Sequence, residues 1–248
     1  MSAPDAPGAP GQVELSIILP AYNEGPAITK AVERYAHVLP GLNRNFEVIV
    51  IDDGSTDDTL ARAQEVAKDR SFVRVIQNDR NRGQVFTIQH GFAESRGEIM
   101  LHNGVDLPLE PNDTEAVLNH FDDGADVVVI ERSNRHAYGL IRKFVSLVNI
   151  TIVRLLFRSP VSDHNFAQAY RRKVIDQITV ETTGVSTVTT ELILKSAALG
   201  FRVDSIPLTY HERQAGTTTV NMRSTVHTMM QLLRLRKVMS KHRAANRK

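Results

Sequence analysis

Short apolar runs alternate with helical patterns along the first half of this chain, and this alternation is the strongest constraint on its fold. Four runs rich in β-branched and other apolar residues are VELSIILP, FEVIVID, FVRVIQN and GEIMLH. The segments between them, about Pro26–Val38, STDDTLARAQEVAKD and GQVFTIQHGFAES, show the capping residues and periodicity of helices. Strands that alternate with helices predict an α/β fold, in which a mostly parallel sheet carries helices on both faces.

After Asp106 the alternation becomes less regular. Strands are predicted in ADVVVIERSNR and FRVDSIPLTYHER, a strand leading into a helix in SDHNFAQAYRRKVI, and a helix ending at Gly200 in TTELILKSAALG. An apolar and basic helical stretch runs from about Tyr138 to Phe157, and a basic amphipathic helix from about Thr225 to Arg243. We expect a disordered leader at residues 1–12, one domain at 13–221, and a basic C-terminal helix and tail at 222–248.

Composition excludes several classes of protein. The 248 residues include no cysteine, which rules out disulfides and thiolate zinc sites and suits a reducing cytoplasm. A net charge of +2 gives no indication of nucleic-acid binding. The start lacks the order of a signal peptide, and Asn149 and Arg154 interrupt the longest apolar run, so no membrane-spanning helix of ~20 residues is expected. We expect a cytoplasmic protein, either free or peripheral on the inner face of the cell membrane.

Polar residues follow three of the predicted strands. Tyr22–Glu24, Asp52–Ser55 and Asn103–Asp106 would share one edge of a parallel sheet, where such folds bind ligands. Asp52 and Asp53 could hydrogen-bond the base and ribose of a nucleotide, although DDGS alone is more typical of a turn with a capping aspartate. Asp106 could likewise close a turn or hold a hard cation, which needs one or two carboxylates when a diphosphate supplies other ligands.

Four motifs, in this order, favour the functional interpretation. LSIILPAYNE, VIVIDDGSTDDT, GEIMLHNGVDL and IPLTYHERQAGTTTVN resemble family 2 glycosyltransferases with the GT-A fold, a Rossmann-like nucleotide-binding domain. The likeness is to the dolichyl- or polyprenyl-phosphate mannosyl- and glucosyltransferase branch, and it covers about Val13 to Asn221. It implies a hexosyltransferase that uses a nucleotide diphosphate sugar, GDP-mannose or a UDP-sugar, with Mg²⁺ or Mn²⁺ as cofactor.

The resemblance also implies roles for particular residues. The nucleotide-sugar pocket would be lined by Pro20, Tyr22, Glu24, Asp52, Asp53, Ser55 and Val105, with Asp53, and Asp52 beside it, on the base or ribose. Asp106 matches the last aspartate of the family's Asp-x-Asp metal motif, and Gly104 replaces the first, which weakens the metal site and shifts reliance to the diphosphate. Basic positions that hold phosphate groups in the family are matched by Arg132, Arg135 and Arg213, with His211 suited to the same task.

The expected acceptor follows from a missing carboxylate. Inverting transfer to a hydroxyl requires a general base, and in hydroxyl-acceptor relatives an acidic pair precedes the helix that ends at the glycine matched by Gly200. Here Val188 and Thr189 take those positions, and the nearest acid is Glu191. A phosphate monoester is already anionic and needs cationic clamps rather than a base. We therefore expect a polyprenyl phosphate acceptor, with Glu191 orienting an arginine or the acceptor.

Two amphipathic stretches bear on how a lipid would be reached. The stretch from Leu140 to Arg158 has an apolar face with a basic rim, which favours the headgroup layer of a membrane. The pattern of the C-terminal helix is more typical of a helix that packs on its own domain or forms a homodimer. Two other functions stay open: a soluble family 2 enzyme that acts on a hydroxyl of a small molecule or glycan, and a noncatalytic nucleotide-sugar-binding relative, which Gly104 would suit.

Overall fold

The computed structural model describes residues 12–133, 157, 159, 161, 163–164, 166–209 and 230–240, with the backbone alone at 185 and 186. The predicted leader and the predicted helix from Tyr138 to Phe157 lie almost wholly outside these residues. Within them, no helix has both the length and the apolar character needed to cross a membrane.

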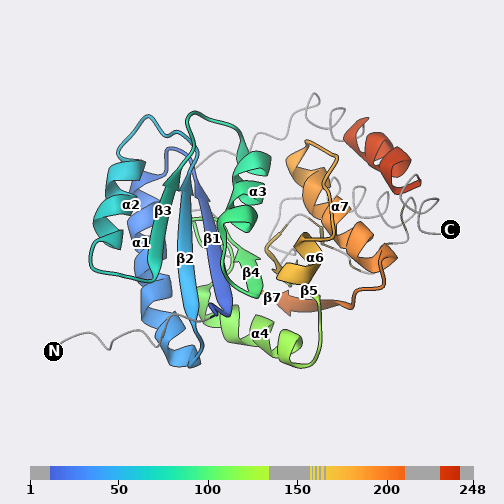
Figure 1. The fold of residues 1–248 in the computed structure, drawn as a ribbon, viewed down its shortest axis with the longest axis horizontal. Helices are drawn as coiled ribbons and strands as arrows, with labels where there is room; N and C mark the ends of the chain where they lie inside the picture. The colour runs from blue at the N-terminus through green and yellow to red at the C-terminus, as the bar shows by residue number, and fades with distance from the viewer. Residues whose placement is uncertain are drawn as a thin grey trace.

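A seven-stranded sheet organises the described residues (Figure 1), in the order β3-β2-β1-β4-β6-β5-β7. Its strands are β1 Leu15–Ala21, β2 Phe46–Asp52, β3 Val73–Gln77, β4 Ile99–His102, β5 Val127–Arg132, β6 Gln168–Arg171 and β7 Val203–Leu208. β6 is antiparallel to both β4 and β5, whereas the other pairs are parallel. The mostly parallel sheet is confirmed, and its one reversed strand is a feature that the sequence patterns left undetermined.

Helices cover both faces of the sheet. α1 (Gly25–Val38), α2 (Thr59–Ala67) and α4 (Thr114–Asp122) bury their apolar residues in one core, and α3 (Gln84–Glu94), α6 (Arg172–Ile175) and α7 (Val185–Ala198) in the other. Short 3-10 turns, η1 (Leu39–Leu42) and η2 (Pro111–Asp113), follow α1 and precede α4. The helices on both faces are confirmed, although α4 was not predicted from the sequence.

β1 shows why the strands read as continuous apolar runs. Successive side chains of a strand point to opposite faces of the sheet, and here both faces are covered. Ile17 and Leu19 accordingly pack in the first core, while Ile18 packs in the second, and all three are fully buried. Because neither face of such a strand meets solvent, apolar residues follow one another along it instead of alternating with polar ones.

α7 ends at the glycine that the sequence indicated. Gly200 has a φ of +85°, in the left-handed region that glycine adopts at low cost. Its N–H donates to the carbonyl of Ala197 at 3.2 Å, and the N–H of Phe201 donates to the carbonyl of Ser196 at 3.1 Å. These two bonds form a Schellman motif, which satisfies carbonyls that the end of the helix would leave unpaired.

The C-terminal helix, residues 230–240, packs on α7. Leu232, Leu235 and Met239 form a small buried cluster with Leu194 and Phe157. Packing on its own domain is therefore confirmed for the described part of this helix. The sequence pattern predicts an apolar face on this helix made of Val226, Met229, Met230, Leu233 and Val238. This prediction is partly wrong: Val238 is buried, but Met230 and Leu233 are 58% and 56% exposed, and Val226 and Met229 lie outside the described residues.

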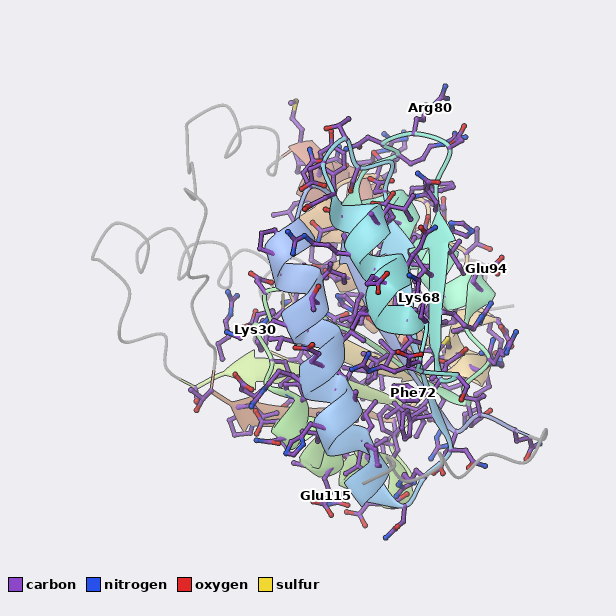
Figure 2. All side chains as sticks on the ribbon, turned by 90° about the vertical axis from the view of Figure 1, so that its left-hand side faces the viewer. Lys30, Lys68, Phe72, Arg80, Glu94 and Glu115 are labelled. Atoms are coloured by element: carbon purple, nitrogen blue, oxygen red, sulfur yellow. The ribbon has the colours of Figure 1, made fainter. Side chains whose placement is uncertain are left out.

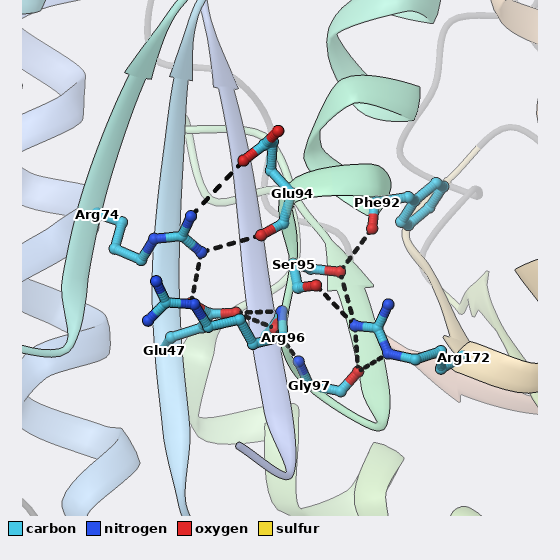
Figure 3. Close-up of polar contacts among 9 residues, drawn as sticks. Glu47, Arg74, Phe92, Glu94, Ser95, Arg96, Gly97 and Arg172 are labelled. Atoms are coloured by element: carbon cyan, nitrogen blue, oxygen red, sulfur yellow. Dashed lines mark hydrogen bonds and ion pairs between the residues drawn. The ribbon is translucent and has the colours of Figure 1, made fainter. Parts of the chain in front are cut away.

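A buried glutamate holds the amino-terminal edge of the sheet together (Figure 3). Glu47 is 3% exposed, and its Oε1 accepts hydrogen bonds from Ser16 Oγ and from the backbone N–H of Arg96, both at 2.6 Å. Its Oε2 pairs with Arg74 Nη1 at 3.0 Å. Strands β1, β2 and β3 are thereby tied to the turn that follows α3.

Glu47→Ala is expected to lower the free energy of unfolding by about 3 kcal/mol, because it leaves three buried or half-buried donors without their acceptor. For a domain of this size the Tm would fall by roughly 6–12 °C, measured by calorimetry. Glu94→Ala is the control: the Glu94 carboxylate also faces Arg74, at 3.7 Å, but it is 44% exposed and its loss should cost less than about 1 kcal/mol. Equal, small effects of the two substitutions would contradict this account.

Candidate functional site at the carboxyl ends of the strands

Three loops meet at the carboxyl-terminal edge of the sheet. β1 lies between β2 and β4, and Ala21 at its end is in register with Asp52 at the end of β2. The N–H of Asp53 donates to the carbonyl of Ala21 at 2.8 Å, and the N–H of Asn103 donates to that of Ile18 at 3.0 Å. Neighbouring strands lie ~4.8 Å apart, so the segments after β2 and β4 leave the sheet roughly 10 Å apart. This separation suits a ligand the size of a nucleoside diphosphate.

The loops after β1 and β2 form one hydrogen-bonded unit. Asn23 has a φ of +54°; its N–H donates to Ser55 Oγ at 3.0 Å, and its Oδ1 accepts from the N–H of Thr56 at 2.9 Å. The N–H of Glu24 donates to Thr59 Oγ1 at 2.8 Å.

Four of the predicted pocket residues lie in or beside this unit. Glu24 and Ser55 belong to it through the bonds just described. Tyr22 immediately precedes Asn23 and is 42% exposed, so its ring is available to a ligand. Pro20 lies next to the end of β1. The structure thus brings together Pro20, Tyr22, Glu24 and Ser55.

Asp53 uses both carboxylate oxygens to hold another loop. Its Oδ1 accepts from Asn78 Nδ2 at 2.7 Å and from the N–H of Arg82 at 2.9 Å, and its Oδ2 accepts from the N–H of Gly83 at 2.8 Å. The side chain is 3% exposed. Asp53 therefore fixes residues 78–83, a segment whose residue Arg80 stands at the top of the view in Figure 2. No sequence pattern had indicated this contact.

Asp52 differs from Asp53 in having a carboxylate oxygen that is not used in a hydrogen bond within the described residues. It is fully buried, and its Oδ2 accepts from the N–H of Ser55 at 3.2 Å. Within the described residues, its Oδ1 has no hydrogen-bond partner. Leaving a buried carboxylate oxygen unsatisfied is costly, and a ligand donor would remove that cost. The geometry thus favours Asp52 over Asp53 for contact with a base or ribose.

The loop after β4 is shaped by Asn103 and Gly104. The Asn103 side chain is buried and donates to Tyr35 Oη and to the carbonyl of Leu109, both at 2.8 Å, so this amide serves the fold. A Cβ on residue 104 would overlap the carboxylate of Asp106, so the glycine makes room for Asp106 as it lies here. Val105 is 2% exposed and belongs to the core, which limits its predicted substrate contact to its backbone.

The residues at this edge fit a metal ion that is shared with a substrate. Asp106 is partly exposed in the loop after β4. The described residues contain no group of three or more potential His, Cys, Asp or Glu ligands, so Asp106 would supply the carboxylate and other oxygens would have to come from elsewhere. Mg²⁺ commonly binds through one or two carboxylates together with phosphate oxygens and water. A cation held jointly by Asp106 and a diphosphate is consistent with this arrangement.

Arg132, predicted to hold phosphate, makes a two-pronged ion pair within the protein. Its Nε and Nη2 donate to the two oxygens of Asp163 at 2.7 and 2.9 Å, and Asp163 is 2% exposed. The guanidinium also lies 5.5 Å from the ring centroid of Phe166. A phosphate-binding role for Arg132 stays a prediction. Arg135, His211 and Arg213 lie outside the described residues.

Glu191 is a buried structural carboxylate. Its two oxygens accept from the N–H groups of Glu181 and Thr182, each at 2.9 Å, and Oε1 also pairs with Lys195 Nζ at 2.7 Å. Burial acts to lower the pKa of Lys195, but hydrogen bonds to Glu191 and Glu181 outweigh it and raise this pKa above its usual value. The charged pair holds the turn that enters α7, whereas the sequence pattern had suggested contact with an arginine or the acceptor.

Several buried polar atoms without partners lie toward the same edge. Besides Asp52 Oδ1, they include His102 Nδ1 at the end of β4 and the Oγ1 atoms of Thr182 and Thr189 near the start of α7, all assessed within the described residues. β4 and β5 are both antiparallel to β6, and β7 is parallel to β5, so β7 runs in the same direction as β4 and begins at the amino-terminal edge of the sheet. Because α7 leads into β7, it ends near the amino-terminal edge and starts near the carboxyl edge. Burial lowers the pKa of His102 to about 4, so its imidazole is neutral at physiological pH. Buried polar groups are seldom unsatisfied, which marks this edge as a place for ligand or water.

Comparison with known proteins assigns the family. The model of "Glycosyl transferase family 2" matches residues 16–179, well over half of the chain. The chain therefore belongs to family 2 of the glycosyltransferases. The match extends from β1 through α6 and contains all three loops of the candidate site.

Curated relatives have names that refer to lipid phosphates. An undecaprenyl-phosphate 4-deoxy-4-formamido-L-arabinose transferase of Pseudomonas savastanoi is 32% identical over 65% of this chain and 48% of its own length. One from Pseudomonas fluorescens is 28% identical over 88% of this chain and 64% of its own. A dodecaprenyl-phosphate galacturonate synthase of Rhizobium johnstonii is 27% identical over 89% and 66%. This chain spans about half to two thirds of the length of these relatives.

A solved structure shares the fold. Glucosyl-3-phosphoglycerate synthase from Mycobacterium tuberculosis, crystallised with Mn²⁺, uridine diphosphate and phosphoglyceric acid, superposes with a TM-score of 0.70 at 17% identity. The alignment covers 93% of this chain and 85% of that one. The predicted GT-A type of fold is confirmed.

The contrast between the two adjacent aspartates can be measured. Asp53→Ala should lower the free energy of unfolding by about 2–4 kcal/mol, because three N–H donors lose their acceptor. Asp52→Asn keeps the shape of the side chain and should cost less than about 1 kcal/mol, yet weaken binding of uridine or guanosine diphosphate about tenfold in calorimetric titrations. Unchanged nucleotide affinity in Asp52→Asn would contradict the assignment.

Proposed function

We propose that this protein transfers a sugar from a nucleoside diphosphate sugar, GDP-mannose or a UDP-sugar, to a polyprenyl phosphate at the cytoplasmic face of a membrane, with inversion at the anomeric carbon. The fold and family membership support nucleotide-sugar chemistry in general. The names of the curated relatives support a lipid phosphate as acceptor.

The choice of a phosphate rather than a hydroxyl acceptor rests on the burial and the hydrogen bonds of Glu191. It is the one acid in the sequence of α7, it is fully buried, and backbone amides and Lys195 engage both of its oxygens. A general base must come within hydrogen-bonding reach of the proton that it removes. Glu191 does not fit that role, and a phosphate monoester does not require it, because its second pKa is about 6.

The proposed reaction is a single displacement. An oxygen of the acceptor phosphate forms a bond to the anomeric carbon while the bond from that carbon to the donor diphosphate breaks on the opposite face, releasing the nucleoside diphosphate. Asp52 and Tyr22 would bind the nucleoside, and the fixed loops would hold the donor in line. Asp106 would hold Mg²⁺ or Mn²⁺, which when bound stabilises the charge on the departing diphosphate. The residues proposed to hold phosphate groups are Arg132, Arg135, Arg213 and His211.

A charge-balanced double variant tests the role of Glu191. Glu191→Gln/Lys195→Met removes the carboxylate and its buried partner together, which avoids leaving one charge unpaired. We expect turnover within about tenfold of the unmodified protein when measured below the Tm of the variant, with the same pH profile. Loss of a general base would cost roughly 10²–10⁴-fold, and a loss of that size in a folded variant would favour a hydroxyl acceptor.

A transfer assay tests the reaction itself. Radiolabelled GDP-mannose and UDP-sugars, incubated with polyprenyl phosphate and Mn²⁺, should give label in the organic-soluble fraction, and Asp106→Ala should abolish the metal-supported part of it. Label transferred instead to a water-soluble hydroxyl acceptor would contradict the proposed acceptor. Nucleotide binding without any product would contradict catalysis.

A further inference from the structure

One face of the C-terminal helix stays exposed after residues 230–240 pack on α7. Met230 and Leu233 are more than half exposed, and they are two of the four exposed large hydrophobic residues within the described chain. Arg234 and Lys237 are exposed on the same face, because the four residues follow helical spacing at i, i+3, i+4 and i+7. We call these four residues the outer strip.

The sequence that contains and follows the outer strip carries charge of a single sign. The sequence from Met230 to Lys248 contains seven lysines and arginines and no aspartate or glutamate. Two apolar side chains flanked by cations form a surface that complements anionic headgroups above an acyl layer. A second copy of the same strip would bring like charges together, which disfavours self-association through this face.

The start of the outer strip lies beside the start of α7. A Cβ on Gly184, the residue that caps the start of α7, would come within 3.2 Å of Gln231 Cγ, so the C-terminal helix begins beside the start of α7. In Figure 1 this helix, coloured red, lies on the outer side of α7. Of the two termini of α7, its amino terminus lies nearer to the carboxyl edge of the sheet. A surface in contact with the outer strip would thus lie on the outer side of α7, with the start of the strip toward the carboxyl edge of the sheet.

We propose that the outer strip docks on an anionic lipid bilayer and so brings the carboxyl edge of the sheet to the headgroup layer. Arg234 and Lys237 contact anionic headgroups, and Met230 and Leu233 enter the boundary between headgroups and acyl chains. This inference rests on the proposed function in one respect: a lipid-linked acceptor gives the docking its purpose. The binding itself requires neither the acceptor nor turnover.

Sedimentation with vesicles tests the docking. The full chain should bind vesicles of phosphatidylglycerol and phosphatidylcholine at low salt and bind pure phosphatidylcholine weakly, with no polyprenyl phosphate in either. Arg234→Gln/Lys237→Gln should lower the partition coefficient about 30-fold, since each cation near an anionic leaflet contributes about fivefold. Met230→Ser/Leu233→Ser should lower it about tenfold.

A matched control separates docking from bulk charge. Lys30→Gln/Lys68→Gln removes the same two charges from the exposed surfaces of α1 and the end of α2 (Figure 2), and it should leave the partition coefficient within about twofold. All the substituted side chains are exposed, so the Tm should stay unchanged.

Several results would overturn the inference. They are a wild-type chain that does not bind the anionic vesicles, outer-strip variants that bind as the wild type does, and a control pair that weakens binding equally. Conversion of a dimer to a monomer by Met230→Ser/Leu233→Ser, with vesicle binding intact, would also overturn it and assign the strip to self-association. Because these vesicles lack the acceptor, failure of the proposed reaction would leave this test unaffected.

Discussion

The candidate site depends on the parallel pairing of β1 with β2 on one side and β4 on the other. This pairing brings three chain segments that are far apart in sequence to a single edge: Tyr22–Glu24, Asp52–Ser55 and Asn103–Asp106. Because both faces of the sheet are buried under helices, a shift of register by one residue would move apolar side chains from one core to the other. The cores therefore fix the register, and the register fixes which polar residues meet.

Side chains then rigidify the loops that leave this edge. Asn23 joins the loops after β1 and β2, Asp53 holds residues 78–83, and Asn103 closes the turn after β4. Asp52 and Asp106 lie within this framework. Such an arrangement suits transfer chemistry, in which a preorganised environment for the departing diphosphate supplies much of the rate enhancement.

Local patterns in the sequence were sufficient to predict the parallel strands, the helices between them and the glycine that ends α7. They were insufficient where the decisive partner is remote. The direction of β6 depends on its neighbours, and the pattern of SDHNFAQAYRRKVI is the same for either direction. α4 is a short helix whose apolar residues, Val117, Leu118 and Phe121, fall in a region that looked irregular.

The same limit applies to single residues at the site. The motif DDGS does not reveal that the partners of Asp53 come from a loop about 25–30 residues later, leaving Asp52 with the unsatisfied oxygen. Likewise, the ion pairs of Arg132 with Asp163 and of Glu191 with Lys195 depend on packing. For the second pair, the i, i+4 spacing was available in the sequence as a signal.

Amide hydrogen exchange tests most directly whether the three loops bind one nucleoside diphosphate. Titration with uridine or guanosine diphosphate and Mn²⁺ should slow exchange in residues 21–25, 52–56 and 103–107 together, with one common midpoint. Protection confined to one of these segments, or midpoints that differ among them, would contradict the account.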